Sequence, residues 1–534
     1  MSPSDDKHVK RDDVLTEAWG RLFGGVDWRW VFILGLAVRV TFVFLANNNG
    51  TDAWTRYEIA GFWLTAPGHL PSEVWPPLHF WILGTGLWIW KSEWAARLLT
   101  AAFGSLTILP YWGLLRRVFG RGTALWSILF FALFGFHVAY SVTTSSEGPT
   151  IFFLVLGFYG WVRFLLSEGW PWLLVGGAGF SAASLCRYEV WIMIPLLAVC
   201  TLAFSGRGRG WLNRRTWIDT VSFALSASIG AMGWMLYNLR VWGDPLAAAK
   251  RNAFTAKYLQ PHHSLVHRLI AVPGALIVTL SPLFAVLVSW GLWEVVRRTQ
   301  VPQETLKRAL AAVALFLVTL QIINSVHSNL TMARFTLMYS WLLIPYAFEA
   351  LRVLLERWRV LEPHAVVCSA VVLFLLWQAG SIIGAYYGPP EFASRLSSVA
   401  PTLPLDPELR DLTHWLKTHR KSGDQVVVDQ YNYEAVDIIR YSNTPFSEAL
   451  PVTEALDLST ARNQFIDFLD RRRPRLLIYC PKGMLGNLWP LGDQNESAVP
   501  ELAIRLRRLW RGERYRVYEI EFSPDSHSQS STEN

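Results

Sequence analysis

Residues 28–46 read WRWVFILGLAVRVTFVFLA, a run whose only charged residue beyond its first turn is Arg39. A helix of about 20 such residues crosses the hydrocarbon core of a membrane. Ten further apolar runs follow, and they begin near Glu93, Gly122, Thr150, Trp170, Val190, Trp217, Leu269, Ala309, Phe335 and His364. The sequence therefore predicts a mostly α, polytopic membrane protein with about eleven spans.

The composition agrees with a membrane protein and excludes several other classes. Hydrophobic residues make up 52% of the chain and charged residues 17%, below the roughly 25% charged residues of soluble domains. The formal charge is +8, but the basic residues recur between apolar runs, so a nucleic-acid surface is not indicated. The four cysteines form no Cys-x-x-Cys pair, which argues against a disulfide framework or a zinc site.

Lysine and arginine indicate the orientation. With residues 1–27 in the cytoplasm as an N-terminal segment, the inner segments hold 20 Lys and Arg and the outer segments hold 9. The positive-inside rule favours this arrangement in the cell (inner) membrane. The run from Leu78 to Trp90 is too short to span, so we expect an interfacial or re-entrant helix there, within the first outer loop 47–92.

The composition changes after residue 388, which divides a transmembrane domain over 28–388 from a smaller one over 389–524. Short β-rich runs appear at Gln425–Asp429, Arg475–Tyr479 and Arg514–Ile520. Residues 407–419 have helical spacing of leucines. We expect a small extracytoplasmic α/β domain, followed by a disordered polar tail over 525–534. Gly483–Gly486 lacks a full phosphate-loop fingerprint and is interpreted as a turn.

Polar side chains of several outer segments converge on one membrane face in this topology. They are Asp52, Arg56, Tyr57, Glu58, His69 and Glu73 in the first, Ser145, Ser146 and Glu147 in the second, Arg187, Tyr188 and Glu189 in the third, Asn238, Arg240, Asp244, Lys250, Arg251 and Lys257 in the fourth, and His327, Asn329 and Arg334 in the fifth. Carboxylates there can take a proton from a hydroxyl, and cations can hold a phosphate leaving group.

Each of these residues also has a purely structural explanation. Asp52 is explained as a solvated loop acid, Arg187 and Glu189 as an ion pair at a helix junction, and Glu147 as an acid favoured by a helix dipole. Arg334 is explained as a snorkelling boundary residue. Arg39 lies inside the first span, where a buried charge is costly, and we expect it to pair with an acid of another helix.

The chain resembles the GT-C superfamily of membrane glycosyltransferases, in the branch of protein O-mannosyltransferases, the aminoarabinose transferase of lipid A and related bacterial family-39-type enzymes. The resemblance covers residues 28–350 and rests on motifs in order. They are Asp52 with Arg56-Tyr57, Pro76-Pro77-Leu78, Arg97-Leu98, Arg116–Arg121, Ser146-Glu147, Arg187-Tyr188-Glu189, Gly243-Asp244-Pro245 and Arg334-Phe335.

The resemblance implies a polyprenyl-phosphate-sugar donor and an acceptor presented outside the cytoplasm. It makes Asp52 the catalytic base, with Glu147 assisting, and assigns Arg187 and then Arg334 to the donor phosphate. Arg56, Tyr57, Tyr188 and Glu189 support them. Relatives often carry two adjacent acids in the first loop, whereas Ala53 follows Asp52 here. No cofactor is expected, and a divalent metal, which some relatives use, is not indicated.

The leading hypothesis is an inverting, hexosyl- or mannosyltransferase-like enzyme with a lipid, glycan or protein acceptor. Two alternatives stay open. One is a transporter or lipid flippase, a class that usually shows internal repeats or paired broken helices, neither of which the sequence reveals. The other is a non-catalytic GT-C scaffold, which the missing second acid favours.

Overall fold

The computed structural model describes residues 13–23, 27–45, 53–65, 75–251, 264–297, 302–328, 333–358, 363–387, 407–429, 438–439, 442–444, 448–451, 469, 472–483, 485–486, 491, 495–499 and 504–522. The chain divides into two compact units. One comprises Met1–Phe254 and His262–Leu403, and the other comprises Thr255–Pro261 and Pro404–Asn534. The fold class expected from the sequence, a helical membrane domain with a small C-terminal α/β domain, is confirmed.

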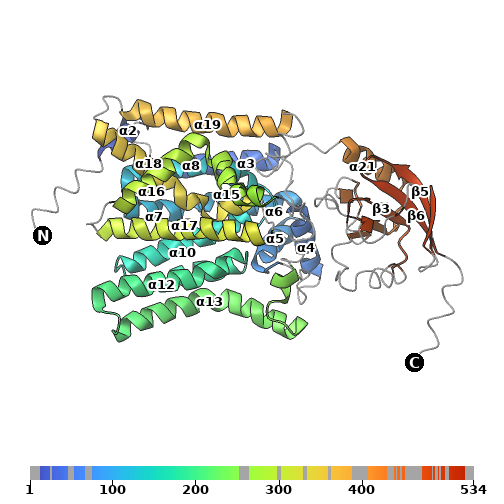
Figure 1. Ribbon diagram of the computed structural model, residues 1–534, viewed down its shortest axis with the longest axis horizontal. Helices are drawn as coiled ribbons and strands as arrows, with labels where there is room; N and C mark the ends of the chain where they lie inside the picture. Colours follow the sequence, from blue (N-terminus) through green and yellow to red (C-terminus); the bar gives the residue numbers. More distant parts are fainter. Residues whose placement is uncertain are drawn as a thin grey trace, which may run out of the picture. The chain divides into compact units, whose positions relative to one another are not determined.

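The first unit is built from helices (Figure 1). In chain order they are α2 Asp13–Phe23, α3 Trp28–Leu45, α4 Ala53–Thr65, α5 Leu78–Ile89, α6 Glu93–Leu106, α7 Ile108–Phe119, α8 Arg121–Ala132, α9 Gly135–Ser141, α10 Glu147–Leu165, α11 Pro171–Ser184, α12 Glu189–Arg209, α13 Arg214–Trp242, α15 Leu265–Leu280, α16 Pro282–Arg297, α17 Pro302–Ser328, the 3₁₀ helix η2 Ala333–Thr336, α18 Leu337–Trp358 and α19 Pro363–Tyr387.

Six of the described helical segments are long and apolar enough to cross a membrane, and two bent pairs raise the number to eight. Three more helices contain shorter apolar segments, Leu78–Ile89, Glu189–Ser205 and Ala365–Gly380. The chain is therefore a multi-pass integral membrane protein, and the count of eleven spans stays a prediction. Helix α5 has 12 residues and begins directly after Pro76-Pro77, at the place expected for a short non-spanning helix.

Two helix pairs are sharply bent, and the sequence analysis predicted neither bend. Helices α8 and α9 meet at 54°, and α15 and α16 meet at 108°. At the second bend, Ser281 has a φ of 78° and precedes Pro282. A residue before proline is disfavoured in the α region, so the helix stops there and restarts at the proline. Broken helices alone thus cannot separate an enzyme from a transporter in this chain.

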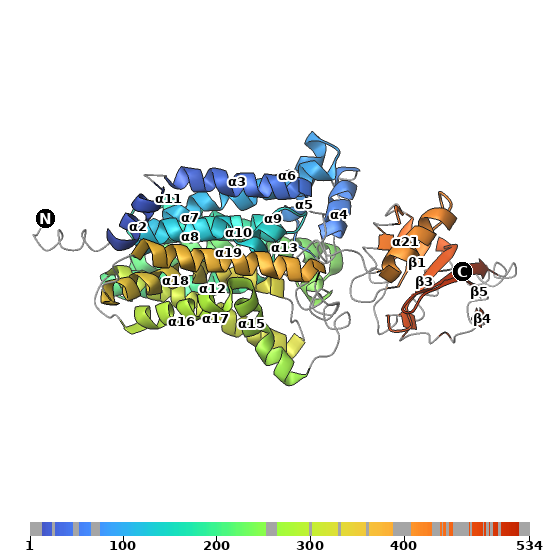
Figure 2. The same ribbon diagram turned by 90° about the horizontal axis from the view of Figure 1, so that it is seen from above.

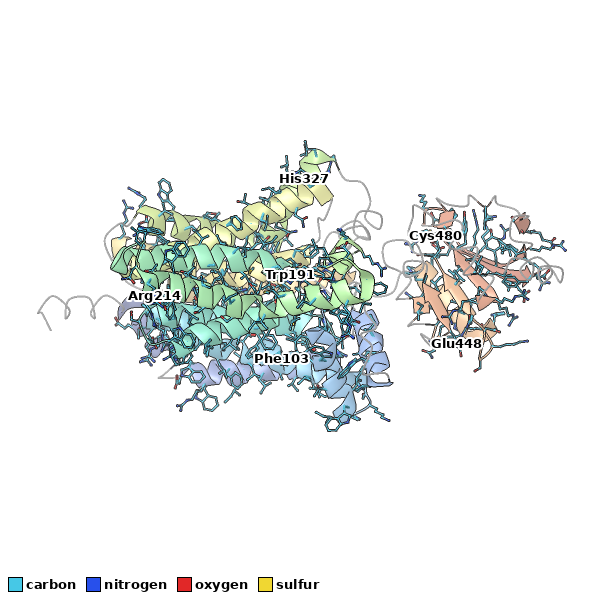
Figure 3. The ribbon with its side chains drawn as sticks, turned by 90° about the horizontal axis from the view of Figure 1, so that it is seen from below. Phe103, Trp191, Arg214, His327, Glu448 and Cys480 are labelled. Carbon is cyan, nitrogen blue, oxygen red and sulfur yellow. The ribbon has the colours of Figure 1, made fainter. Side chains whose placement is uncertain are left out.

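Different helices lie at the two ends of the helical unit. Figures 1 and 2 show α2 at one end and α4 and α5 at the other. Figure 3 shows Arg214, from the segment with the strongest predicted inner charge, far along the bundle from His327, which the sequence places in an outer segment. The separation agrees with the predicted in–out order of these segments.

Residues 13–23 form a helix, whereas the sequence patterns gave the N-terminal segment no structure. Leu15 and Trp19 of this helix, α2, are buried. Trp19 packs edge-on against Trp126 of α8, whose indole Nε1 donates to the Leu15 carbonyl oxygen at 3.2 Å. The amphipathic spacing of apolar residues could have indicated this helix, but the surrounding charges obscured it.

Glycines allow the backbones of α10, α11 and α13 to approach closely. A Cβ on Gly160 of α10 would lie 2.4 Å from the Gly176 nitrogen of α11, and one on Gly179 would lie 2.5 Å from the Gly157 nitrogen. On the other side of α11, a Cβ on Gly230 of α13 would meet the Ser181 carbonyl oxygen at 2.3 Å. Small residues commonly permit such close contacts between membrane helices.

Replacement of Gly160 by alanine is expected to destabilise the helical unit by about 1–3 kcal/mol, because the added methyl group meets backbone that cannot rotate away. The matched control is Gly233→Ala in α13, where nothing lies within 4 Å of the added Cβ. Thermal unfolding in detergent should show a lower midpoint for Gly160→Ala only. Equal midpoints for both variants would contradict the close packing of α10 and α11.

The expectation that Arg39 pairs with an acid of another helix is wrong for the part of the chain that the structure describes, where no acid pairs with it. Its fully buried guanidinium donates to the carbonyl oxygens of Gly35 and Ala132, each at 3.0 Å, and to Ser141 Oγ at 3.1 Å. Its Nη2 lies 2.8 Å from His137 Nδ1. The Ala132 carbonyl lies at the bend between α8 and α9, so Arg39 satisfies backbone that the broken helix leaves unpaired.

The second unit packs helix α21 (Pro407–His419) against a sheet of order β2-β1-β3-β6-β5-β4. The strands are β1 Val426–Val428, β2 Ala449–Pro451, β3 Leu476–Tyr479, β4 Glu496–Val499, β5 Ile504–Arg511 and β6 Arg516–Phe522. Strands β1, β2 and β3 are parallel, and β4, β5 and β6 join antiparallel. Leu409, Leu412 and Leu416 of α21 are buried in its core, as the leucine spacing predicts.

Candidate active site

Arg187 lies at the junction of α11 and α12 and joins the second and third outer segments. Its Nη1 donates to Glu147 Oε1 and its Nη2 to Glu189 Oε1, both at 2.6 Å. Nη1 also lies 3.4 Å from Ser146 Oγ. The Arg187 side chain is 8% exposed and that of Glu147 is 2% exposed. The structure thus combines two sequence interpretations, because the Arg187–Glu189 pair exists and is extended to a second, buried acid.

Glu147 owes its place to the start of α10. The helix begins at Glu147 after Ser146, so the carboxylate sits in the first turn, as the sequence predicted. There it faces the positive end of the helix dipole as well as Arg187. Glu147 can therefore stabilise the start of α10 and also pair with Arg187. From this helix end its carboxylate fixes the position of the guanidinium.

Arg334 lies in η2 and reaches the same aromatic ring as Arg187. The Arg187 guanidinium lies 5.4 Å from the centroid of the Phe335 ring, and that of Arg334 lies 5.6 Å from it. Phe335 thereby brings the third and fifth outer segments together. The two arginines assigned to a donor phosphate by resemblance share one neighbourhood, although 147 residues of sequence separate them.

The first outer segment contributes Arg56 and Tyr57 from α4. Arg56 is buried, and its guanidinium lies 4.3 Å from the ring centroid of Trp75 and 5.9 Å from that of Phe80. Tyr57 is half-buried and packs against the cluster of Ala60 and Leu83. Cation–π contact with two rings allows Arg56 to stay charged away from bulk water.

Asp52 lies outside the described residues, and so does the side chain of Glu58. The next residue in the chain, Ala53, is the first residue of α4. Its carbonyl oxygen accepts a hydrogen bond from Thr144 Oγ1. Thr144 precedes Glu147 by three residues, so the chain immediately after Asp52 is attached to the turn that carries Glu147.

Tyr188 and Glu189 complete the junction around Arg187. The Tyr188 hydroxyl accepts a hydrogen bond from Trp234 Nε1 at 3.0 Å, and its ring packs edge-on against Trp191. Trp234 stacks on Tyr237 with ring centroids 5.2 Å apart. Tyr188 directly precedes α12, Trp191 lies in α12, and Trp234 and Tyr237 lie in α13, so aromatic rings from both helices pack next to the Arg187 junction.

Cys186 lies next to Arg187 in the chain, and its buried surroundings oppose ionisation of the thiol. Burial raises the pKa of the Cys186 thiol to about 12, although a hydrogen bond with Thr150 and the charges of Arg56 and Arg187 act against it. The thiol therefore stays protonated at neutral pH. The same interactions place Arg56 and Arg187 within electrostatic reach of one residue, which links the first and third outer segments.

Two buried residues near the site were not assigned a role by sequence reasoning. His79 Nε2 lies 2.9 Å from the Thr144 carbonyl oxygen. Arg97 of α6 donates from Nε to the Val142 carbonyl oxygen at 2.8 Å. Both hold the turn that leads to Glu147. A histidine directly after Pro-Pro-Leu was the available signal for the first, but its partner is distant in sequence.

The described residues contain no group of three or more His, Cys, Asp or Glu side chains suited to a metal ion. In the second unit, the Gly483–Gly486 turn has an internal anion. The Asp429 carboxylate accepts from the backbone nitrogens of Cys480 and Leu485, each at 3.0 Å. This contact explains the turn without a phosphate, in line with its interpretation from sequence.

Comparison with known proteins supports the resemblance. Residues 74–234 match the family model of dolichyl-phosphate-mannose-protein mannosyltransferases. The fold is similar to ArnT from Cupriavidus metallidurans bound to undecaprenyl phosphate, with a TM-score of 0.57, 16% identity, and coverage of 92% of this chain and 98% of ArnT. The apo state of that ArnT gives 0.56 at 14% identity, covering 92% and 97%.

An archaeal oligosaccharyltransferase, AglB from Archaeoglobus fulgidus in complex with an inhibitory peptide and a dolichol-phosphate, aligns less closely. Its TM-score is 0.47 at 14% identity, with 86% of this chain and 70% of AglB covered. The search of curated proteins gave no match.

The helices make the chain a polytopic membrane protein, and its helical unit holds a buried ionic cluster around Arg187. The family model and the ArnT-like architecture confirm the resemblance to the GT-C glycosyltransferases.

Proposed function

We propose that this chain transfers a sugar from a polyprenyl-phosphate carrier to an acceptor hydroxyl at the extracytoplasmic face of the cell membrane. The observation that carries the proposal is the buried Arg187, held by Glu147 and Glu189 and sharing Phe335 with Arg334. The Arg187 and Arg334 guanidinium groups both lie beside the Phe335 ring, and two cations in one neighbourhood suit an anion such as a lipid phosphate. The ArnT of similar fold is bound to undecaprenyl phosphate, a ligand of this chemistry.

We assign the steps of this reaction to Asp52, Arg187, Arg334 and Glu147. Asp52 takes the proton of the acceptor hydroxyl, whose oxygen attacks the anomeric carbon from the side opposite the phosphate. The bond from that carbon to the phosphate oxygen breaks, and its electron pair stays on the phosphate. Arg187 and Arg334 stabilise the negative charge that develops there, and the anomeric configuration inverts. Glu147 assists by fixing Arg187, because its carboxylate is already engaged by that guanidinium.

The second unit is proposed to lie outside the cytoplasm and to influence the acceptor. The acceptor is a lipid, glycan or protein hydroxyl, and a mannose-like hexose or a pentose is the transferred sugar. The reaction as written needs no metal ion.

The purified protein in detergent, without any gradient, is expected to release polyprenyl phosphate from at least one labelled polyprenyl-phosphate sugar. The assay offers a panel of hexose and pentose donors together with a membrane extract as the source of acceptor. Chemistry without a gradient distinguishes an enzyme from a transporter or flippase. Gradient-independent release would support the proposal, whereas lipid movement in proteoliposomes with no release from any donor would overturn it in favour of the transporter.

A further inference from the structure

His79 is a buried residue near the site that the proposed reaction leaves without a role. Its ring is fully buried in the first turn of α5, and Nε2 lies 2.9 Å from the Thr144 carbonyl oxygen. A carbonyl oxygen only accepts hydrogen bonds, so Nε2 carries the proton and donates it. Nδ1 is also buried, and it has no hydrogen-bond partner within the part of the chain that the structure describes.

Thr144 links His79 to the start of α4. While its carbonyl oxygen accepts from His79, its hydroxyl donates to the carbonyl oxygen of Ala53 at the start of α4. Thr144 also stands three residues before Glu147. Thr144 therefore binds His79 through its carbonyl oxygen and Ala53 through its hydroxyl group.

The first turn of α5 reaches the third outer segment as well. The Leu78 backbone nitrogen donates to the Leu185 carbonyl oxygen at 3.0 Å, two residues before Arg187. Leu78 and His79 are consecutive, so a single turn of helix contacts the segments that carry Glu147 and Arg187. Pro76 and Pro77 precede it, and their fixed φ values restrict how the chain enters this turn.

We propose that His79 is a positioning residue that holds the Asp52 and Glu147 segments together through Thr144. This rests on the proposed function only in so far as Asp52 is the base. His79 acts through the Nε2–H donor, since that atom makes the contact. Loss of the donor frees Thr144, and the residue after Asp52 shifts relative to Glu147 and Arg187. A displacement of about 1 Å at a reacting group can cost a factor on the order of 100 in rate.

The test compares His79→Gln with His79→Phe. The glutamine amide can place its nitrogen near the position of Nε2 and still donate to Thr144, whereas phenylalanine keeps the ring shape and removes the donor. His79→Phe is expected to lower kcat about 10- to 100-fold with little change in the KM for donor, and His79→Gln is expected to restore most of the rate. Thr144→Val should reproduce the loss and Thr144→Ser should not.

A double variant separates a shared path from two independent effects. If His79 acts through Thr144, then His79→Phe combined with Thr144→Val loses no more kcat than His79→Phe alone. Fully multiplied losses would overturn the proposal, and so would a His79→Gln variant as slow as His79→Phe, because the ring rather than the donor would then matter.

Hydrogen–deuterium exchange gives a readout that does not depend on transfer. Peptides from α4 and from the first turn of α10 are expected to exchange faster in His79→Phe and Thr144→Val than in the wild type, His79→Gln or Thr144→Ser. Unchanged exchange in His79→Phe would overturn the positioning role even if transfer is observed. Absence of transfer by the wild type, with the predicted exchange pattern, would instead overturn the proposed function alone.

Discussion

Arg187→Gln is expected to lower kcat for sugar transfer by at least about 100-fold, the usual scale for removing a group that stabilises charge in the transition state. The glutamine retains a polar side chain but loses the positive charge opposite the leaving phosphate. Arg187→Lys keeps the charge and loses the paired contacts to Glu147 and Glu189, so an intermediate rate is expected. The rate of polyprenyl phosphate release per folded protein is the measurement.

Stability must be separated from chemistry in this variant, because Glu147 would lose the partner of its buried charge. Removing one member of a buried ion pair costs about 3–5 kcal/mol. Arg352 offers a matched control. It lies in the C-terminal part of α18, whereas Arg334 lies just before the first residue of that helix. It is 12% exposed and pairs with the buried Glu349 and the partly exposed Glu356, each at 2.6 Å. Arg352→Gln should lower the unfolding midpoint, by less than Arg187→Gln because Lys307 still pairs with Glu349 at 3.1 Å, and it should leave the transfer rate of the folded fraction intact.

The comparison with Arg352 decides the role of Arg187. If both variants lose stability but only Arg187→Gln loses transfer, the charge at Arg187 serves the reaction. Equal transfer by the two variants, after correction for the folded fraction, would leave Arg187 as a structural ion pair and remove it from the mechanism.

Asp52→Asn is expected to insert and fold but to lower kcat about 100- to 10,000-fold, the range ascribed to general acid–base groups. The amide has nearly the same size as the carboxylate but cannot accept the proton of the acceptor hydroxyl. Binding of a polyprenyl phosphate is expected to persist, because the arginines proposed to hold the phosphate are unchanged.

Glu58→Gln is the control for Asp52, since it removes the other nearby acid of the first outer segment. This variant should transfer at close to the wild-type rate. Full activity of Asp52→Asn would exclude Asp52 as the base, and a loss confined to Glu58→Gln would move that role to Glu58. Loss in both variants would indicate that two acids of this segment share the proton transfer.

Sequence patterns predicted elements best where one local rule sufficed. The apolar runs located the membrane helices, and the β-rich runs at Gln425–Asp429 and Arg475–Tyr479 contain β1 and β3. Strand β5, Ile504–Arg511, was missed although its buried Ile504 and Leu506 alternate with exposed arginines. Its high arginine content obscured a period of two that was present.

Local residue patterns could not predict contacts between segments that are distant in the sequence. One partner of Arg39 is the Ala132 carbonyl oxygen at a helix bend, and no residue pattern near Arg39 predicts that bend. The link from His79 through Thr144 to Ala53 joins three segments through backbone oxygens, which every residue possesses. A pattern of side chains therefore could not single out these partners.

Residue patterns were enough to predict the membrane class, the order of the helices and the charged residues of the segments expected to face outside, because hydrophobic length and charge bias act locally along the chain. The pairing of Arg187 with Glu147, the Phe335 ring that it shares with Arg334 and its electrostatic neighbourhood with Arg56 became visible in the three-dimensional structure. The physical reason is that a buried charge is stable only where packing supplies its partners, and close packing of helices through Gly160 and Gly176 is a property of pairs of helices rather than of any one segment.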